Sequence, residues 1–109
     1  MLTTQEVDLY IRATLKQHGI SNVKHSFKQM SRTLGYYFVQ KNEIVLSVTC
    51  LKSFTLFRLV LLHEIAHVLQ YKELGGVSKT KNGRNDFHGK VFKKWCGVLN
   101  ISSSRFIRA

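Results

Sequence analysis

The chain has 109 residues, of which 44% are hydrophobic and 21% charged, and it carries seventeen Lys and Arg against six Asp and Glu. This length suits one globular domain with a buried core, so we expect a single domain over residues 1–109 that acts as a monomer. The most apolar stretch, 54–62, is interrupted by Arg58 and is too short to cross a bilayer, so we expect no membrane partner.

The first residues lack the basic start, apolar middle and small-residue cleavage site of a secretory signal, which predicts a cytoplasmic protein. Cys50 and Cys96 lie far apart and form no Cys-x-x-Cys pair. We therefore expect two reduced, buried thiols rather than a disulfide framework or a zinc ribbon.

The N-terminal half predicts one helix followed by three strands. Thr3 and Glu6 form a capping-box pattern, and the apolar residues that follow recur at helical spacing until His18 and Gly19. Alternating or aromatic-rich patterns then predict strands over 23–30, 34–39 and 43–49. The short connections 31–33 and 40–42 suit hairpins, so we expect an antiparallel sheet.

The C-terminal half predicts two helices. Ser53 can cap a long helix over 54–74 that is apolar around most of its circumference and stops at Gly75. A flexible basic loop is expected over 77–85, and a last helix over 89–99 carries one apolar face. The expected fold class is α+β, with a small antiparallel sheet of about three strands packed on the central helix and flanked by the N- and C-terminal helices.

A His-Glu-x-x-His motif lies on the central helix. His63 and His67 are four residues apart, so their side chains project from one face and can share a tetrahedral zinc ion, one Zn²⁺ per chain. Glu64 is rotated to one side, where its carboxylate can accept a proton from a zinc-bound water that attacks a peptide carbonyl. Burying these three polar residues on an apolar helix would be costly without such a partner.

A catalytic zinc normally takes a third protein ligand. The candidates are His18 at the end of the first helix, His25 in the first strand and His88 at the start of the last helix. We favour His88, because the glycine-containing loop before it allows the chain to reverse and bring the last helix back to the motif.

Four segments resemble the SprT-like zinc metallopeptidase domain family, the Spartan-type protease domain. They are the motif at His63–His67, the segment His88–Trp95, the glycine-containing segment Arg32–Tyr37 and the strand Glu43–Ser47, and the resemblance spans about residues 26–101. It implies a zincin-like fold, zinc held by His63, His67 and His88, and Glu64 as the general base.

The basic residues gather toward the C-terminus, because residues 72–109 hold nine of the seventeen Lys and Arg. Many of them lie near the expected third ligand and could draw DNA to the rim of the site, although a solvated basic face is the alternative. The candidate DNA contacts are Lys79, Lys81, Arg84, Lys90, Lys93 and Lys94, with Arg105 and Arg108 beyond them.

Aromatic residues add two weaker expectations. Tyr36, Tyr37, Phe87 and Trp95 could stack on unpaired bases, but Trp95 fits the apolar face of its helix better. Tyr36, Tyr37 and Tyr71 could stabilise an oxyanion, and none is assigned that role.

The functional prediction is a zinc-dependent endopeptidase of the SprT-like type that cleaves DNA-associated proteins. Two alternatives stay open: a DNA-binding module with a structural or vestigial zinc site, and a zinc hydrolase that acts on something other than a protein.

Overall fold

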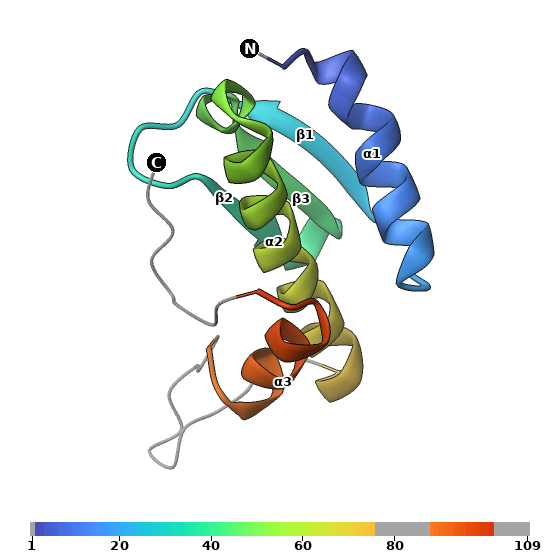
Figure 1. Ribbon diagram of the computed structural model, residues 1–109. Coiled ribbons are helices and arrows are strands. Elements are labelled where there is room, and N and C mark those ends of the chain that lie inside the picture. Colours follow the sequence, from blue (N-terminus) through green and yellow to red (C-terminus); the bar gives the residue numbers. More distant parts are fainter. Residues whose placement is uncertain (1, 76–87, 102–109) are drawn as a thin grey trace.

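The computed structural model describes residues 2–75 and 88–101. Within them the chain is α+β, with three α-helices and one small sheet. In Figure 1 the long helix α2 (Phe54–Leu74) lies in front of the sheet, α1 (Thr4–Gln17) lies beside the strand β1, and α3 (Lys90–Val98) packs at the C-terminal half of α2. The predicted α+β class is therefore confirmed.

The helices begin and end where their capping residues predict. The Thr3 Oγ1 accepts from the Glu6 N–H at 3.1 Å, and Glu6 Oε2 accepts from the Thr3 N–H at 3.3 Å, which completes the capping box of α1. The Ser53 hydroxyl accepts from the Leu56 N–H at 3.4 Å at the start of α2. Gly75 ends α2 with φ of 65°, a left-handed conformation that glycine adopts without penalty.

The sheet is mixed, so the predicted antiparallel sheet is wrong in part. Its strands are β1 (Lys24–Lys28), β2 (Gly35–Phe38) and β3 (Glu43–Ser47), in the order β1-β3-β2. The β2–β3 hairpin is antiparallel, as predicted, and a short 3₁₀ turn η1 (Val39–Lys41) joins its strands. In contrast, β1 pairs with β3 in parallel, so the connection 31–33 does not form a hairpin.

The physical reason lies at the end of β3. The chain leaving β1 passes the end of β3 before it enters β2, and Ser47 holds this crossing in place. The Ser47 N–H donates to Leu34 O at 2.9 Å, and its hydroxyl donates to Met30 O at 3.1 Å. The connection between β1 and β2 therefore crosses the end of the central strand β3 and does not fold back into a hairpin with β1.

The strands are shorter than their sequence patterns predict. The last predicted strand, 43–49, ends at Ser47, where the Ser47 hydroxyl accepts from the Thr49 N–H at 3.2 Å and a 3₁₀ turn η2 (Val48–Lys52) begins. Because β3 is the central strand, its Ile44, Val45 and Leu46 are all buried, on both faces of the sheet.

The core lies between the sheet, α1 and α2. Gly35 lets β2 approach α2 closely, because a Cβ at that position would lie 3.0 Å from Val60 Cγ1. Tyr10 of α1 packs edge-on against Phe54 and Phe57 of α2, at ring-centroid distances of 5.1 and 5.7 Å. The C-terminal half of α2 is left to contact α3. None of the described helices combines the length and apolarity needed to cross a bilayer.

Candidate metal centre

The three histidines expected to hold a metal lie together in the structure. His63 and His67 occupy successive turns of α2, with ring centroids 5.0 Å apart. His88, just before α3, lies 5.7 Å from the His63 ring and 4.9 Å from the His67 ring. One nitrogen from each ring falls in a group whose members are all within 4.8 Å of one another, so the three histidines form a candidate metal-binding group.

Phe92 of α3 brings these rings together. It is fully buried, and its ring contacts all three imidazoles, at centroid distances of 5.1 Å to His63, 4.4 Å to His67 and 4.9 Å to His88. The sequence placed Phe92 on the apolar face of the last helix and gave it no role at the site. His88 lies two residues before α3 and Phe92 lies in its first turn, and this short separation along the chain is the signal that links the two.

Burial keeps two of the histidines neutral. Desolvation, and then the neighbouring His88, lower the pKa of His63 to about 4. Desolvation, and then His63, lower the pKa of His67 to about 3. Both rings therefore have a lone pair available at neutral pH, which is the form that binds a metal.

A transition-metal cation such as zinc fits this donor set. His63 Nδ1 is buried and lacks a hydrogen-bond partner among the residues that the structure describes, so one polar atom of this ring is unsatisfied. Three imidazole side chains suit zinc, which favours nitrogen ligands and tolerates an open position in catalytic sites. The residues present thus match the cofactor that the motif predicts.

Glu64 is buried beside the histidine cluster. Its side chain is 4% exposed, and desolvation raises its pKa to about 8. Burial raises the pKa of the Cys50 thiol in η2 to about 11, and electrostatic repulsion from the Glu64 carboxylate raises it in addition. The Cys50 thiol donates to Leu34 O at 3.2 Å, so this cysteine is a protonated, hydrogen-bonded core residue. Cys50 and Cys96 are both buried free thiols, as predicted.

Gln70 is a second neighbour of the site that the sequence did not single out. Its Oε1 lies 3.3 Å from His67 Nδ1, one helical turn along α2. In the sequence, a glutamine near the end of an apolar helix indicates the start of the polar, solvent-exposed end of that helix. In the structure the side chain is instead only 5% exposed.

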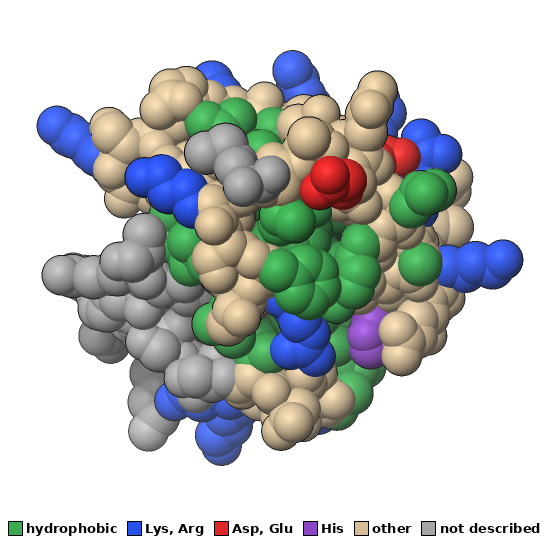
Figure 2. Space-filling view, turned by 45° about the horizontal axis from the view of Figure 1, so that its top comes forward, with side chains coloured by type: hydrophobic (Ala, Val, Ile, Leu, Met, Phe, Trp, Pro, Cys, Tyr) green, Lys and Arg blue, Asp and Glu red, His purple; other side chains and the backbone are tan. Residues whose placement is uncertain are grey.

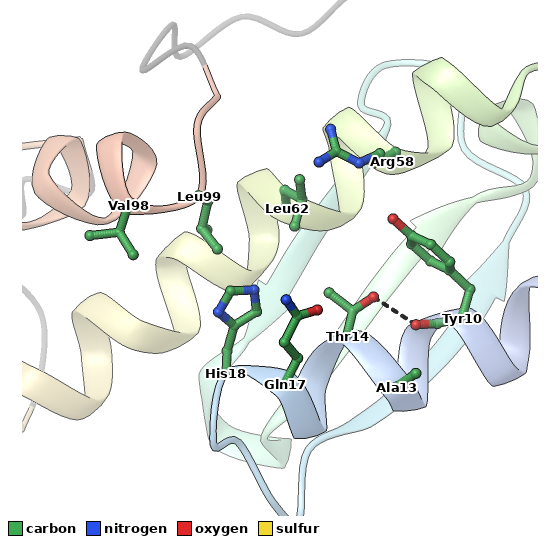
Figure 3. A pocket seen from close by; sticks show the side chains of 9 residues that line it. All are labelled: Tyr10, Ala13, Thr14, Gln17, His18, Arg58, Leu62, Val98 and Leu99. Atoms are coloured by element: carbon green, nitrogen blue, oxygen red, sulfur yellow. Dashed lines mark hydrogen bonds between the residues drawn. The ribbon is translucent and has the colours of Figure 1, made fainter.

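The two alternative ligands lie elsewhere. His25 Nε2 contacts Asp8 Oδ1 at 2.7 Å, between β1 and α1. His18 borders a cavity of about 310 Å³ between α1, α2 and the end of α3, together with Arg58 and Leu62 (Figure 3). Neither histidine belongs to the metal-ligand group found within residues 2–75 and 88–101.

The candidate oxyanion residues have packing roles in the structure. The Tyr37 and Tyr71 rings meet edge-on at 6.2 Å. The Tyr37 hydroxyl donates to Asn42 Oδ1 at 2.6 Å, and desolvation, followed by Tyr71, raises its pKa. Tyr36 lies near Phe38, at 6.4 Å between ring centroids. No oxyanion role is assigned to any of them.

The basic residues of α3 differ in how free they are. Lys90, Lys93 and Lys94 are all exposed. Lys94, however, pairs with Glu73 of α2, and its ammonium lies 4.8 Å from the centre of the Trp95 ring. Trp95 is half-buried and packs against the core, in agreement with the packing role expected for it.

The remaining candidate DNA contacts lie outside the described residues, as do the predicted loop 77–85 and the residues Lys79, Lys81, Arg84, Phe87, Arg105 and Arg108. On the face shown in Figure 2, Lys and Arg side chains are spread around the edge and acidic side chains are few. Eight of the seventeen Lys and Arg precede residue 72, so basic charge is not confined to the C-terminal part of the chain.

The fold and the cluster together define an α+β domain with a three-histidine candidate metal centre on a His-Glu-x-x-His helix. The family model described as the SprT-like family matches residues 3–107. The chain therefore belongs to the SprT-like family, as the resemblance of its motifs predicted. Comparison with curated proteins and with solved structures gave no match.

Proposed function

We propose that the protein is a zinc-dependent endopeptidase of the SprT-like type, with a zincin-like active site, that cleaves proteins associated with DNA. The observation that carries the proposal is the buried Glu64 next to a cluster of three histidines, in a chain that belongs to the SprT-like family. A site of this composition suits hydrolysis of an amide bond.

The histidines and Glu64 have separate roles in this proposal. His63, His67 and His88 would hold one zinc ion through neutral ring nitrogens. Bound zinc supplies a Lewis acid that polarises a carbonyl and acidifies water. Glu64 takes a proton from the attacking water as the new C–O bond forms, and it gives a proton to the leaving amine as the C–N bond breaks. The carboxylate thus ends each cleavage in the state in which it began.

The burial of Glu64 suits it for both proton transfers. A general base and acid works best with a pKa near the working pH, and burial raises the pKa of Glu64 to about 8. A cation held by the three neighbouring histidines would favour the ionised carboxylate, the form that can accept a proton. The two influences act in opposite directions and keep the group able to exchange a proton near neutral pH.

The DNA part of the proposal rests on charge. The chain has a formal net charge of +11, and Lys90 and Lys93 are exposed on the helix that follows His88. Such charge attracts the phosphate backbone of DNA without regard to sequence. We also propose a single-domain monomer in the cytoplasm, where the two buried free thiols would stay reduced.

Cleavage of a DNA-bound protein by wild type and by Glu64→Gln tests the proposal directly. We expect about one zinc per chain in both proteins by elemental analysis, and a loss of cleavage of about 10²–10⁴-fold in Glu64→Gln, the range typical of a removed general acid–base group. Retention of cleavage by Glu64→Gln would reject the mechanism. DNA binding without any cleavage would favour the DNA-binding module, and cleavage of a small amide but no protein would favour a non-peptidase hydrolase.

The DNA contacts have their own test. Neutralising Lys79, Lys81 and Arg84 together should weaken DNA binding and reduce its salt dependence, with zinc content unchanged. A Lys90→Gln, Lys93→Gln pair should act in the same direction. Equal affinity of a variant and wild type at low salt would remove the corresponding group from the DNA-binding surface.

A further inference from the structure

His67 is held by two described neighbours that are neither metal ligands nor the general base. Its ring stacks on Phe92, with centroids 4.4 Å apart and planes inclined by 24°. Its Nδ1 lies 3.3 Å from Gln70 Oε1. One contact acts on the face of the ring and the other on its edge, so they constrain different motions.

Stacking on Phe92 fixes the plane of the ring but not its orientation within that plane. Turning the imidazole by 180° about its χ2 axis exchanges the positions of Nδ1 and a ring carbon, and it leaves the stacking area nearly the same. The hydrogen bond to Gln70 distinguishes the two orientations, because only one of them places a nitrogen against the amide oxygen.

The same hydrogen bond decides which nitrogen carries the proton. An amide oxygen can only accept, so His67 Nδ1 must be the donor. A histidine that binds a metal is a neutral imidazole, and a neutral imidazole has one N–H. The lone pair is therefore on Nε2. The reverse orientation of the amide would place its NH₂ group against Nδ1 and leave the proton on Nε2, which would block that nitrogen as a ligand.

The burial of Gln70 shows that its side chain is not simply a solvated end of α2. It is 5% exposed, and its Nε2 is buried with no hydrogen-bond partner in the described part of the chain. An unpaired buried N–H group is unfavourable, and an apolar side chain would avoid that cost. The contact with His67 gives the amide oxygen a function that an apolar residue could not supply.

We propose that Gln70 is a positioning residue for the metal centre, whose side-chain oxygen holds His67 in the Nδ1–H tautomer and so presents Nε2 to the cation. This inference rests on the metal centre of the proposed function, but it does not depend on cleavage of any substrate. In this proposal the orientation and tautomer of the ligand His67 are set by a residue three positions further along α2.

The first test is made on the metal-free wild-type protein. Long-range ¹H–¹⁵N NMR spectra at pH 7 distinguish the two tautomers of a neutral histidine through the chemical shifts of its ring nitrogens. We expect His67 to be mainly Nδ1–H in wild type. In Gln70→Leu that form should no longer be the major one, and in Gln70→Glu, which keeps an acceptor oxygen, it should be restored. A wild-type His67 in the Nε2–H form would overturn the proposal.

The second test is zinc affinity, measured by competition with a chelator. Loss of a group that orients a metal-binding histidine typically weakens binding by about 10–100-fold, and we expect Gln70→Leu to fall in this range. Gln70→Glu should bind close to wild type. The matched control is Gln17→Leu, the same change at an exposed position of α1, which should leave zinc affinity unchanged. Wild-type affinity in Gln70→Leu would overturn the positioning role.

These readouts separate a positioning role from a purely structural one. Circular dichroism and thermal unfolding of the metal-free variants report folding, and a structural role alone would not move the tautomer of His67 or be rescued by Gln70→Glu. If Gln70→Leu does not fold, the wild-type tautomer and the Gln70→Glu affinity still decide the matter. A protein that passes both tests and yet cleaves nothing would reject the proposed peptidase activity and leave the role of Gln70 intact.

Discussion

Two histidine environments in this molecule differ in the hydrogen-bond partners of their ring nitrogens. His25, between β1 and α1, has a carboxylate at 2.7 Å, and its side chain and that of Asp8 are 15% and 35% exposed. His63, in contrast, is buried among other imidazoles and Phe92, and its Nδ1 has no partner among the described residues. A histidine paired with an acid has its partner within the protein, whereas three imidazoles that lie together are suited to share a cation.

The largest effect is expected from removing one histidine of each kind. His88→Ala should lower zinc affinity by more than about 100-fold, the upper range for changes outside the ligand set, because it removes a ligand itself. His25→Ala should keep about one zinc per chain. Elemental analysis after dialysis against a weak chelator measures both. Equal zinc loss in the two variants would contradict the contrast between the two environments.

Substitutions at Phe92 and Phe57 can distinguish a loss of core packing from a loss of metal binding. Phe92→Leu and Phe57→Leu each shorten a fully buried aromatic residue, and each should cost about 1–2 kcal/mol of unfolding free energy. Only Phe92→Leu should also weaken zinc binding, because Phe92 contacts all three imidazoles. Chemical denaturation and chelator competition provide the two measurements. Similar zinc affinities in both variants would mean that Phe92 does not position the rings.

The buried groups predict an unusual pH dependence for the metal-free protein. The pKa values of His63 and His67 are lowered to about 4 and about 3, so the unfolded chain binds more protons there, and stability falls as the pH drops below about 6.5. The pKa of Glu64 is raised from 4.5 to about 8, so between these values the folded chain holds a proton that the unfolded chain has lost. Below about pH 6.5 the two histidines outweigh this effect, and above it the Glu64 effect alone remains, so stability falls as the pH rises toward 8.

Stability should therefore be greatest near pH 6.5, where the two trends meet. Each proton contributes a slope of at most about 1.4 kcal/mol per pH unit. Urea denaturation between pH 5 and 8.5 measures the profile. Glu64→Gln should lose the decline on the alkaline side and keep the decline on the acidic side. An unchanged alkaline decline in that variant would assign it to another group.

The smallest effect on stability is expected at the pair formed by His25 and Asp8. Asp8→Asn removes the partner of His25 and of Arg12, which contacts the other Asp8 oxygen at 3.1 Å. Because these groups are partly exposed, the loss should be about 1 kcal/mol or less. Zinc affinity should not change. A loss of zinc in Asp8→Asn would show that the two histidine environments are coupled through the core.

The sequence predicted those parts of the structure that depend on local signals. Thr3 with Glu6, Ser53 and Gly75 mark helix ends through contacts within one turn, so the bounds of α1 and α2 were predicted closely. The two histidines of the motif share a face for the same reason. The prediction of His88 rested on the expected reversal of the chain and on the resemblance to the family, and the structure places this residue in the cluster.

Features set by distant contacts were not predictable in this way. The direction of β1 depends on hydrogen bonds from Ser47 to the connection between β1 and β2, and no local pattern distinguishes that crossing from a hairpin. The roles of Phe92 and Gln70 depend on how α3 packs against α2. Their residue types are ordinary for the faces of a helix, so only the packed structure shows what they contact.

The position of β3 between its two partners has a consequence for the order of folding. The β2–β3 hairpin pairs residues 5 to 11 positions apart along the chain, whereas the parallel pairing of β1 with β3 joins residues 19 positions apart, which costs more entropy. The hairpin can therefore form early, and β1 with α1 behind it joins a surface that already exists. Ser47 forms hydrogen bonds to the connection between β1 and β2, so it links the part of the fold that forms early to the part that forms late.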